Sequence, residues 1–400
     1  MFDFFRKAAS ASAPEAKASA VGPLTAGVPA ARAAITGVAR PGLAPVRSGG
    51  GVRAGFQRNP VGFRAVRLIA ESAAALPLVL QDCDRRYDTH PLMTLIRRPN
   101  PAQGKAELLE ALYSQLLLAG NAYVEAVRPE DAPLPQELHV LRSDRMSVVP
   151  GADGWPVGYE YTVGSRRHRF HMGDGPPPVL HIRSFHPTDD HYGLSPLEAA
   201  AQAVELHNSA AHWSRALLDN AARPSGAIVY RGPEGQGSMT NEQFERLQSE
   251  MESHHQGARN AGRPMLLEGG LDWKPMGFSP SDMEFHRTKE AAARDIAIAF
   301  GVPPMLLGIP GDATYANYQE ANRAFYRLTV LPLATRVTAA LAHWLSGHSG
   351  AAVELRPDLD QVPALAPERE ATWRRVAEAS FLTEAEKRAL LGLPPVVDGG

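Results

Sequence analysis

The sequence predicts an α+β fold, with short strands in the first half of the chain and long capped helices in the second half. The strands are indicated by short alternating or apolar runs between turn clusters, at residues 122–127, 138–149, 157–163 and 178–185. The helices are indicated by an N-cap residue with Glu or Gln three positions later, a capping box, at Ser195, Thr240 and Thr383. With 400 residues and 44% hydrophobic composition, the chain can bury a sizeable core.

The overall composition limits the function classes. The formal net charge of −2 gives no global basic field of the kind that attracts nucleic acid. The single cysteine, Cys83, excludes an intrachain disulfide and fits assembly in the cytosol. We find no run of the ~18 apolar residues that a membrane span needs, and the start Met1–Phe5 lacks the apolar core of a signal peptide.

The first half of the chain begins with a segment of Ala, Gly, Pro and Ser, which predicts a flexible arm over residues 1–55. A helix is expected over 60–74, followed by a strand over 76–80. Leucines at helical spacing predict a buried helix over 106–119, which Gly120 and the next residue should end.

The second half begins with a helix from Ser195, whose Pro196 stands where its missing N–H costs nothing. This helix should run to about Ala222, because the Arg223-Pro224 step disfavours the α conformation. A second amphipathic helix should start at Thr240.

A hairpin is expected next, with Met265–Leu267 and Leu271–Pro275 as its strands around Glu268 and two glycines. A third helix should span about 281–300 and end at Gly301, in the left-handed conformation.

The C-terminal region should contain a flexible loop at 308–314 and then a long helix from Tyr315 toward His343, bent at Pro332. The last helix should start at Thr383 and stop at Gly392.

Motifs for catalysis are weak. Gly104-Lys105 is followed by Ala106 where a phosphate-binding loop needs Ser or Thr, so we reject that loop. The best metal candidate is the set His181, His186, Asp189, Asp190 and His191. Such residue types bind Zn or Mn, which makes a metal-dependent hydrolase the alternative function. Their spacing matches no ligand pattern, and ordinary loop polarity is the favoured explanation for them.

Several short motifs occur in a characteristic order and spacing. They are Gly193-Leu-Ser-Pro-Leu, Arg223-Pro-Ser-Gly, Asn260-Ala-Gly-Arg, Leu267-Glu-Gly-Gly-Leu-Asp-Trp-Lys-Pro, Phe300-Gly-Val-Pro-Pro, Asn317-Tyr-Gln-Glu and Leu390-Leu-Gly-Leu-Pro-Pro. No single motif is specific, but the ordered set resembles the portal proteins of long-tailed phages and of gene transfer agents, over about residues 56–395. The Ala- and Arg-rich composition and the compact length favour the gene transfer agent type.

The resemblance implies a portal fold with an α/β wing, a helical stem, a small β-hairpin clip and a short helical crown. The implied parts are a flexible arm 1–55, a wing 56–239, a stem helix 240–256, a clip 257–283, a second stem helix 284–307, a tunnel loop 308–316, a wing helix and return 317–365, and a crown 366–400.

The resemblance also implies the function. Such proteins form a ring, expected to be a dodecamer, at one capsid vertex of a virion or gene transfer agent particle that is assembled in the bacterial cytoplasm. The ring nucleates head assembly with the major capsid protein, docks the terminase large subunit, conducts double-stranded DNA without sequence specificity during packaging and ejection, and binds the tail adaptor. No enzyme activity, cofactor, metal or membrane is expected. Another virion component, such as a scaffold or adaptor, is the remaining alternative.

Two sets of site residues follow from the resemblance. The expected channel lining consists of Asp312, Thr314, Tyr315 and Asn317, where a carboxylate and weak polar groups would let DNA slide. The expected docking surface for terminase and adaptor is the clip, with Glu268, Leu271, Asp272, Trp273 and Lys274. An ordinary surface loop is the alternative for the first set.

Overall fold

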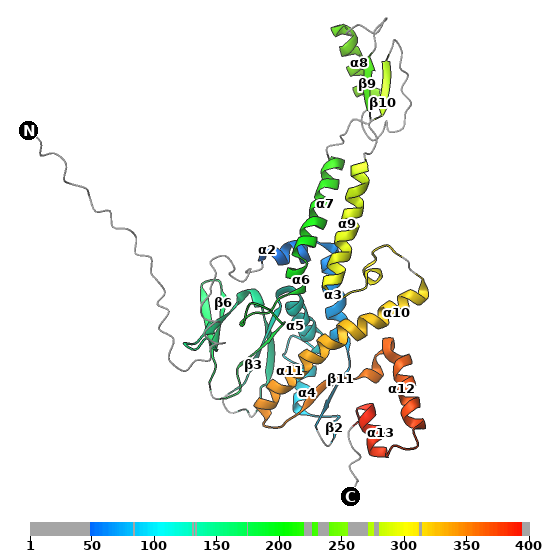
Figure 1. Cartoon of the computed structure of the whole chain (residues 1–400). Helices are drawn as coiled ribbons and strands as arrows, with labels where there is room; N and C mark the ends of the chain where they lie inside the picture. The colour runs from blue at the N-terminus through cyan, green and yellow to red at the C-terminus, as the bar shows by residue number, and fades with distance from the viewer. Residues whose placement is uncertain are drawn as a thin grey trace, which may run out of the picture.

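The computed structural model shows an α+β body in which helices pack on small antiparallel sheets, with two helices projecting from it (Figure 1). It describes residues 49–82, 85–129, 132, 134–173, 175–219, 226–230, 240–254, 271–275, 280–311 and 314–393. The expected N-terminal arm therefore lies almost entirely outside the described residues, as do Cys83, Glu268 and Asp312.

The helices agree largely with the sequence prediction. They are α2 Gly49–Val52, the π turn η1 Arg53–Gln57, α3 Pro60–Ala75, α4 Pro91–Arg97, α5 Lys105–Ala119, α6 Pro196–Ala199, α7 Ala201–Asp219, α8 Asn241–His254, α9 Pro280–Ala299, α10 Tyr315–Phe325, the π turn η5 Tyr326–Val330, α11 Leu331–Ser349, α12 Ala366–Glu378 and α13 Glu384–Leu391. Helices α4 and α12 were not expected as separate helices. Residues 49–55, expected as the end of the flexible arm, instead form α2 and the start of η1, because they pack against α3 and α6. The helix predicted from Ser195 is divided at Ala200 into α6 and α7.

Among the described residues, the strands form four small antiparallel sheets. They are β1 Leu78–Gln81, β2 Arg86–Tyr87, β3 Asn121–Val127, β4 Glu137–Leu141, β5 Met146–Pro150, β6 Pro156–Val163, β7 Arg166–His171, β8 Val179–Arg183, β9 Gly226–Tyr230, β10 Leu271–Pro275 and β11 Glu354–Pro357. Their orders are β11-β1-β2, β4-β3-β8, β5-β6-β7 and β10-β9. The first sheet joins an early part of the chain to a late one, because β11 pairs with β1 from Leu78↔Pro357 to Gln81↔Glu354.

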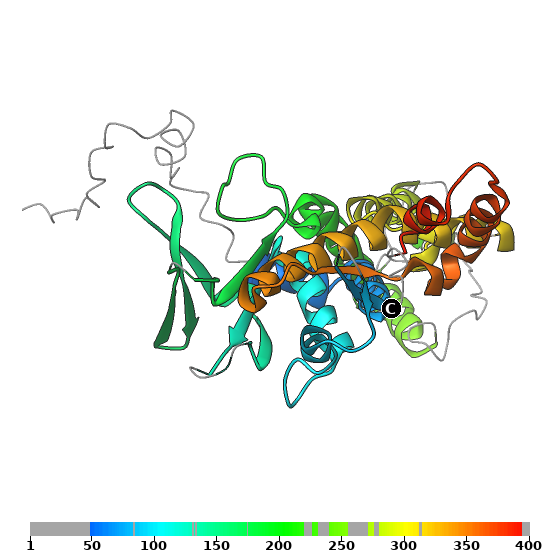
Figure 2. The same cartoon turned by 90° about the horizontal axis from the view of Figure 1, so that it is seen from below.

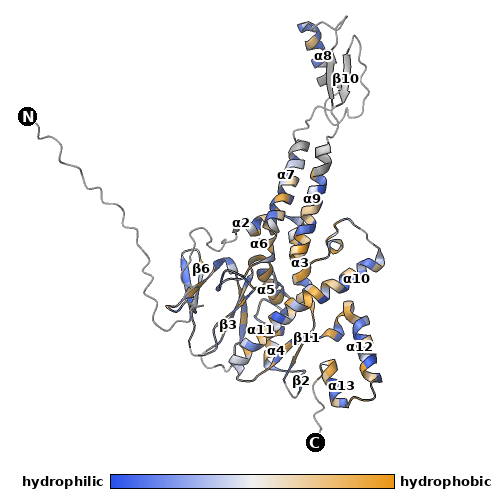
Figure 3. Ribbon diagram, in the orientation of Figure 1, coloured by the Kyte–Doolittle hydropathy of each residue, from blue (hydrophilic) through white to orange (hydrophobic). Residues whose placement is uncertain are grey.

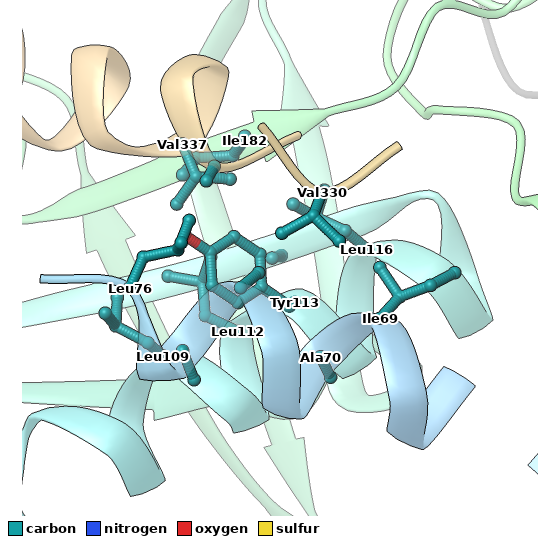
Figure 4. Packing of buried hydrophobic residues seen from close by; sticks show 14 of the residues in the cluster. Ile69, Ala70, Leu76, Leu109, Leu112, Tyr113, Leu116, Ile182, Val330 and Val337 are labelled. Atoms are coloured by element: carbon teal, nitrogen blue, oxygen red, sulfur yellow. The ribbon is translucent and has the colours of Figure 1, made fainter. Parts of the chain in front are cut away.

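The main core lies where α3, α5, α9 and α11 meet (Figure 3). Tyr113 of α5 is fully buried among Leu76, Leu109, Val330 and other apolar side chains (Figure 4). A second, smaller cluster lies between the sheets of β3 and β6 and includes Tyr123, Tyr159 and Phe170. Burial of this apolar area, at about 25 cal/mol per Å², is the main force that holds the body together.

Side-chain caps are observed at the three expected helix starts. At Ser195 only half of the expected capping box is observed among the described residues, where its Oγ accepts from Glu198 N at 2.9 Å. Thr240 and Gln243 exchange the two bonds of a capping box, as do Thr383 and Glu386. These caps satisfy N–H groups that a helix leaves unpaired at its start.

The long C-terminal helix is interrupted by the π turn η5, immediately before Pro332. Proline has no N–H and its ring collides with the carbonyl one turn earlier, so a wider turn relieves the conflict at the predicted bend. By length and composition, the 35-residue helix Tyr315–Ser349 would also be apolar enough to cross a membrane, contrary to our reading of the sequence. Burial of Val337, Leu341 and Leu345 in the main core accounts for this apolar composition.

Candidate functional site: the projecting stem and its distal module

Helices α7 and α9 lie side by side and project from the body as a two-helix stem (Figure 1). The Trp213 ring of α7 stacks on the Phe285 ring of α9, with centroids 4.1 Å apart and planes inclined by 20°. The stem partner of α9 is therefore α7, and not the helix at 240–256 that the family resemblance implied. Helix α8, which fills that segment, exposes Phe244 and lies beyond the end of the stem.

A buried polar network fixes the base of the stem to the body. Asn59 Nδ2 donates to Asn208 Oδ1 at 3.0 Å and lies 3.2 Å from His207 Nδ1. Asn208 Nδ2 in turn donates to the backbone oxygen of Ala54 at 2.9 Å. Burial, together with the positive charge of Lys289, lowers the pKa of His207, so its imidazole is neutral in this network.

A contact between two glycines fixes the start of the same stem. Gly120, at φ +70°, and Gly193 approach so closely that a Cβ on either would lie 2.2 Å from the carbonyl oxygen of the other. Asn121 Oδ1 accepts from Gly193 N at 2.8 Å and from His181 Nε2 at 3.0 Å. This joint holds the Gly193-Leu-Ser-Pro motif against the sheet that contains β3. The sequence identified both glycines but not their contact.

The distal module consists of β9, α8 and β10 (Figure 1). Four expected docking residues, Leu271, Asp272, Trp273 and Lys274, lie on β10. They pair with Tyr230, Val229, Ile228 and Ala227 of β9, respectively. The expected hairpin partner of β10 was Met265–Leu267, which lies outside the described residues; within them, β10 pairs with β9. The long sequence separation of β9 and β10 explains why local pattern did not reveal this pair.

Three of the four expected channel residues, Thr314, Tyr315 and Asn317, lie at the N-terminus of α10, and Asp312 lies outside the described residues. Thr314 is the N-cap, and its Oγ1 accepts from Asn317 N at 3.2 Å. Tyr315 is 78% exposed, and its hydroxyl accepts from Gln319 Nε2 at 3.0 Å. The first half of α10 is solvent-exposed, and the backbone oxygen of Pro310 in the preceding loop accepts from Arg294 of α9.

The histidine and aspartate candidates do not form a metal centre. His181 stacks on Tyr123 inside the smaller core, and burial, with the positive charges nearby, lowers the pKa of its imidazole to about 3. His186 Nδ1 accepts from Thr188 N, and Asp189 Oδ1 accepts from the backbone N–H groups of His191 and Tyr192. Among the residues that the structure describes, no three His, Cys, Asp or Glu side chains are placed to share a metal ion. Turn formation and core packing account for these residues.

The family is shown by comparison with known proteins. The family model "Phage portal protein" matches residues 60–392, which is most of the chain. The chain therefore belongs to the phage portal protein family. This family membership agrees with the resemblance identified from the sequence motifs.

The chain is also similar to subunits of gene transfer agent (GTA) particles. It is 70% identical to a chain in the neck of an empty GTA particle computed with C6 symmetry, with a TM-score of 0.75 and coverage of 90% of this chain and 97% of the other. It is 67% identical to a chain in the neck of a native GTA particle computed with C12 symmetry, with a TM-score of 0.75 and coverage of 91% and 99%. The probable portal protein of Streptomyces phage phiC31 is 28% identical, over 84% of this chain and 75% of its own length.

Proposed function

We propose that this chain is one subunit of the portal ring of a gene transfer agent particle, and that the ring conducts double-stranded DNA without reading its sequence. The projecting stem of α7 and α9, with the β9–α8–β10 module at its end, is the observation that supports this most directly. At 1.5 Å per residue, the 20-residue α9 is about 30 Å long, which suits the wall of a short channel.

Ring closure requires each subunit to present two different surfaces, one to each neighbour. We propose twelve subunits, and the C12 symmetry of a similar neck structure supports this number. Stems arranged around one axis would form a tube, with the distal modules together at one end of it.

The channel lining is proposed to include Asp312, Thr314, Tyr315 and Asn317. The last three lie in or next to the exposed first half of α10, which extends from the body beside the stem. A lining with few cations binds phosphate weakly, so DNA can move through it.

The distal module is proposed to be the clip. There the ring would dock the terminase large subunit during packaging and the tail adaptor afterwards, using Leu271–Lys274 and the neighbouring Glu268. Exposed strands of such a module can add to strands of other chains. The body would contact the major capsid protein, nucleate head assembly in the bacterial cytoplasm, and remain in the finished particle.

We propose no catalytic role for the chain. The cluster that suggested a hydrolase is used for structure: His181 packs in the smaller core, and Asp189 caps a turn. The stem and family membership support a structural role instead.

The test is complementation of particle production in cells that lack the gene for this chain. We expect cells without it to release no particles with nuclease-protected DNA, and the wild-type chain to restore them. A variant with residues 308–316 shortened should still form heads but retain less DNA. Normal DNA content in particles made without this chain would contradict the proposal.

A further inference from the structure

Strand β7 forms an open edge of the sheet β5-β6-β7. Its six residues pair in regular register with β6, from Gly158↔His171 to Val163↔Arg166. Within the described residues, no strand lies along its other side. The backbone N–H of Met172, the residue after β7, donates to Val157 O at 3.1 Å. By the alternation of an antiparallel ladder, the N–H and C=O groups of Arg167, Arg169 and His171 therefore point to the open edge.

One face of this edge is basic. Arg167, Arg169 and His171 share it because alternate residues of a strand point to the same face. Their partners across the ladder are Thr162, Glu160 and Gly158, so this pair of strands brings one carboxylate to the face. Glu160 lies 3.6 Å from Arg167, whose side chain is 72% exposed. The face therefore has a net positive charge available to a partner.

The opposite face is mixed. On β7 it carries Arg166 and His168, which are exposed, and Phe170. Phe170 is buried against the smaller core, and the Phe170 partner on β6 is Tyr159. At the end of the strands, Val157 and Met172 remain 47% and 41% exposed. The apolar part of this face therefore lies at the Phe170 and Met172 end. A strand added beside β7 could place apolar side chains there and acidic side chains on the basic face.

Proteins usually protect an exposed edge with a proline, a bulge or a very short strand. Strand β7 has six residues without proline, and its pairing with β6 shows no register shift. Strand β7 does carry charged side chains, which also discourage pairing at an edge. Charges of one sign, however, additionally select a partner of the opposite sign.

We propose that β7 accepts an extended strand from another protein, in which acidic and apolar side chains alternate. If this chain is the proposed portal subunit, that strand would come from the protein shell around the ring. The reason is that the β5-β6-β7 sheet lies at the end of the body opposite α10 and α12 (Figures 1 and 2). If α10 faces the channel, this sheet faces outward.

Two other occupants fit less well. The chain's own residues 1–48 contain six basic and two acidic side chains, so their charge does not complement the edge. Double-stranded DNA would use the arginines, but it would neither pair with the open backbone groups nor cover Val157 and Met172.

The test uses the purified full-length chain and a fluorescent eight-residue peptide of alternating glutamate and valine. A peptide with four glutamates followed by four valines is the matched control. We expect the alternating peptide to bind more tightly in fluorescence anisotropy, and to slow hydrogen exchange of the Arg167, Arg169 and His171 amides. Equal binding of the two peptides, or unchanged exchange at these amides, would overturn the inference.

Two variants separate strand pairing from simple charge attraction. Arg169→Ala removes the guanidinium group but keeps the edge N–H, whereas Arg169→Pro removes both, and edge positions tolerate proline. We expect Arg169→Pro to bind the alternating peptide about 2- to 10-fold more weakly than Arg169→Ala, as for the loss of one hydrogen bond. Equal affinities would contradict strand addition. If Arg169→Pro does not fold, the pair Arg167→Pro and Arg167→Ala makes the same comparison.

Two further measurements test the alternatives: binding of a 20-base-pair DNA duplex, and the mass of the particles in solution. Duplex DNA that displaces the peptide and is itself weakened equally by both Arg169 variants would overturn the proposal in favour of a DNA contact. Light scattering on the same sample reports whether the chain forms rings. Rings without peptide binding refute the edge proposal alone, whereas peptide binding by a chain that never forms rings refutes the proposed function.

Discussion

Gly120→Ala should strongly destabilise the joint between the body and the stem. The substitution has two separate costs. A non-glycine residue at φ +70° costs about 1–2 kcal/mol, and the new Cβ would lie 2.2 Å from the carbonyl oxygen of Gly193. Relief of such overpacking costs about 1–3 kcal/mol more. We therefore expect a total loss of about 2–5 kcal/mol.

Two control substitutions isolate the two costs. Gly164→Ala has the left-handed conformation, at φ +60°, but no atom within 4 Å of the new Cβ, so it should cost about 1–2 kcal/mol. Gly193→Ala meets the Gly120 oxygen at 2.2 Å without a left-handed φ, so it should cost about 1–3 kcal/mol. Gly120→Ala should therefore destabilise the chain most. Gly193→Ala should follow, and Gly164→Ala should destabilise it as much as Gly193→Ala or less.

The assay is urea denaturation followed by tryptophan fluorescence, together with hydrogen exchange at the joint. Exchange of the Ser184 amide, which donates to Gly120 O at 2.8 Å, should accelerate in Gly120→Ala and Gly193→Ala but not in Gly164→Ala. If Gly120→Ala and Gly164→Ala are equally stable, the close contact between the two glycines does not exist in solution and the reasoning is refuted.

Three further substitutions test other parts of the structure. Tyr113→Phe should be neutral or stabilise the chain by up to about 1 kcal/mol, because the buried hydroxyl has no hydrogen-bond partner among the described residues. A clear loss of unfolding free energy in urea denaturation would show that the hydroxyl has a partner. Trp213→Ala should cost about 1–2 kcal/mol by removing the stacked pair with Phe285, and unchanged protection of α9 amides would argue against the stem. Trp273→Ala should weaken binding of terminase or adaptor with no change in the melting of the body, since aromatic side chains are frequent interface anchors; normal binding of both purified partners would contradict the proposed clip.

The sequence predicted well those elements whose signals are local. Ser195, Thr240 and Thr383 mark helix starts because a cap requires a polar side chain within three residues of the N–H it serves. Gly301 was expected in the left-handed conformation and has φ +66°. These features need no information from distant parts of the chain.

Features that depend on distant contacts were missed or wrongly assigned. Strand β7 reads Arg-Arg-His-Arg-Phe-His, which has no strand-like apolar pattern, and its pairing with β6 and the burial of Phe170 stabilise it. Strand β11 pairs with β1, more than 270 positions earlier. Helices α7 and α8 are both amphipathic, and their long-range packing, which places Trp213 on Phe285, shows that α7 pairs with α9.

The site was predicted by family resemblance rather than by local chemistry. Trp273 and Lys274 do lie in the distal module, and Thr314, Tyr315 and Asn317 do lie at an exposed helix start. Their proposed contacts with partners and DNA depend on the arrangement of many subunits, which a single chain does not contain.

The most direct test of the portal function is the mass of the purified chain by light scattering, with electron microscopy of the same peak. A portal ring predicts a species of about twelve subunits, seen as rings with a central hole and with the α7–α9 stems around it. A single chain or dimer at all concentrations, with no rings even when the other head proteins are added, would contradict the portal function.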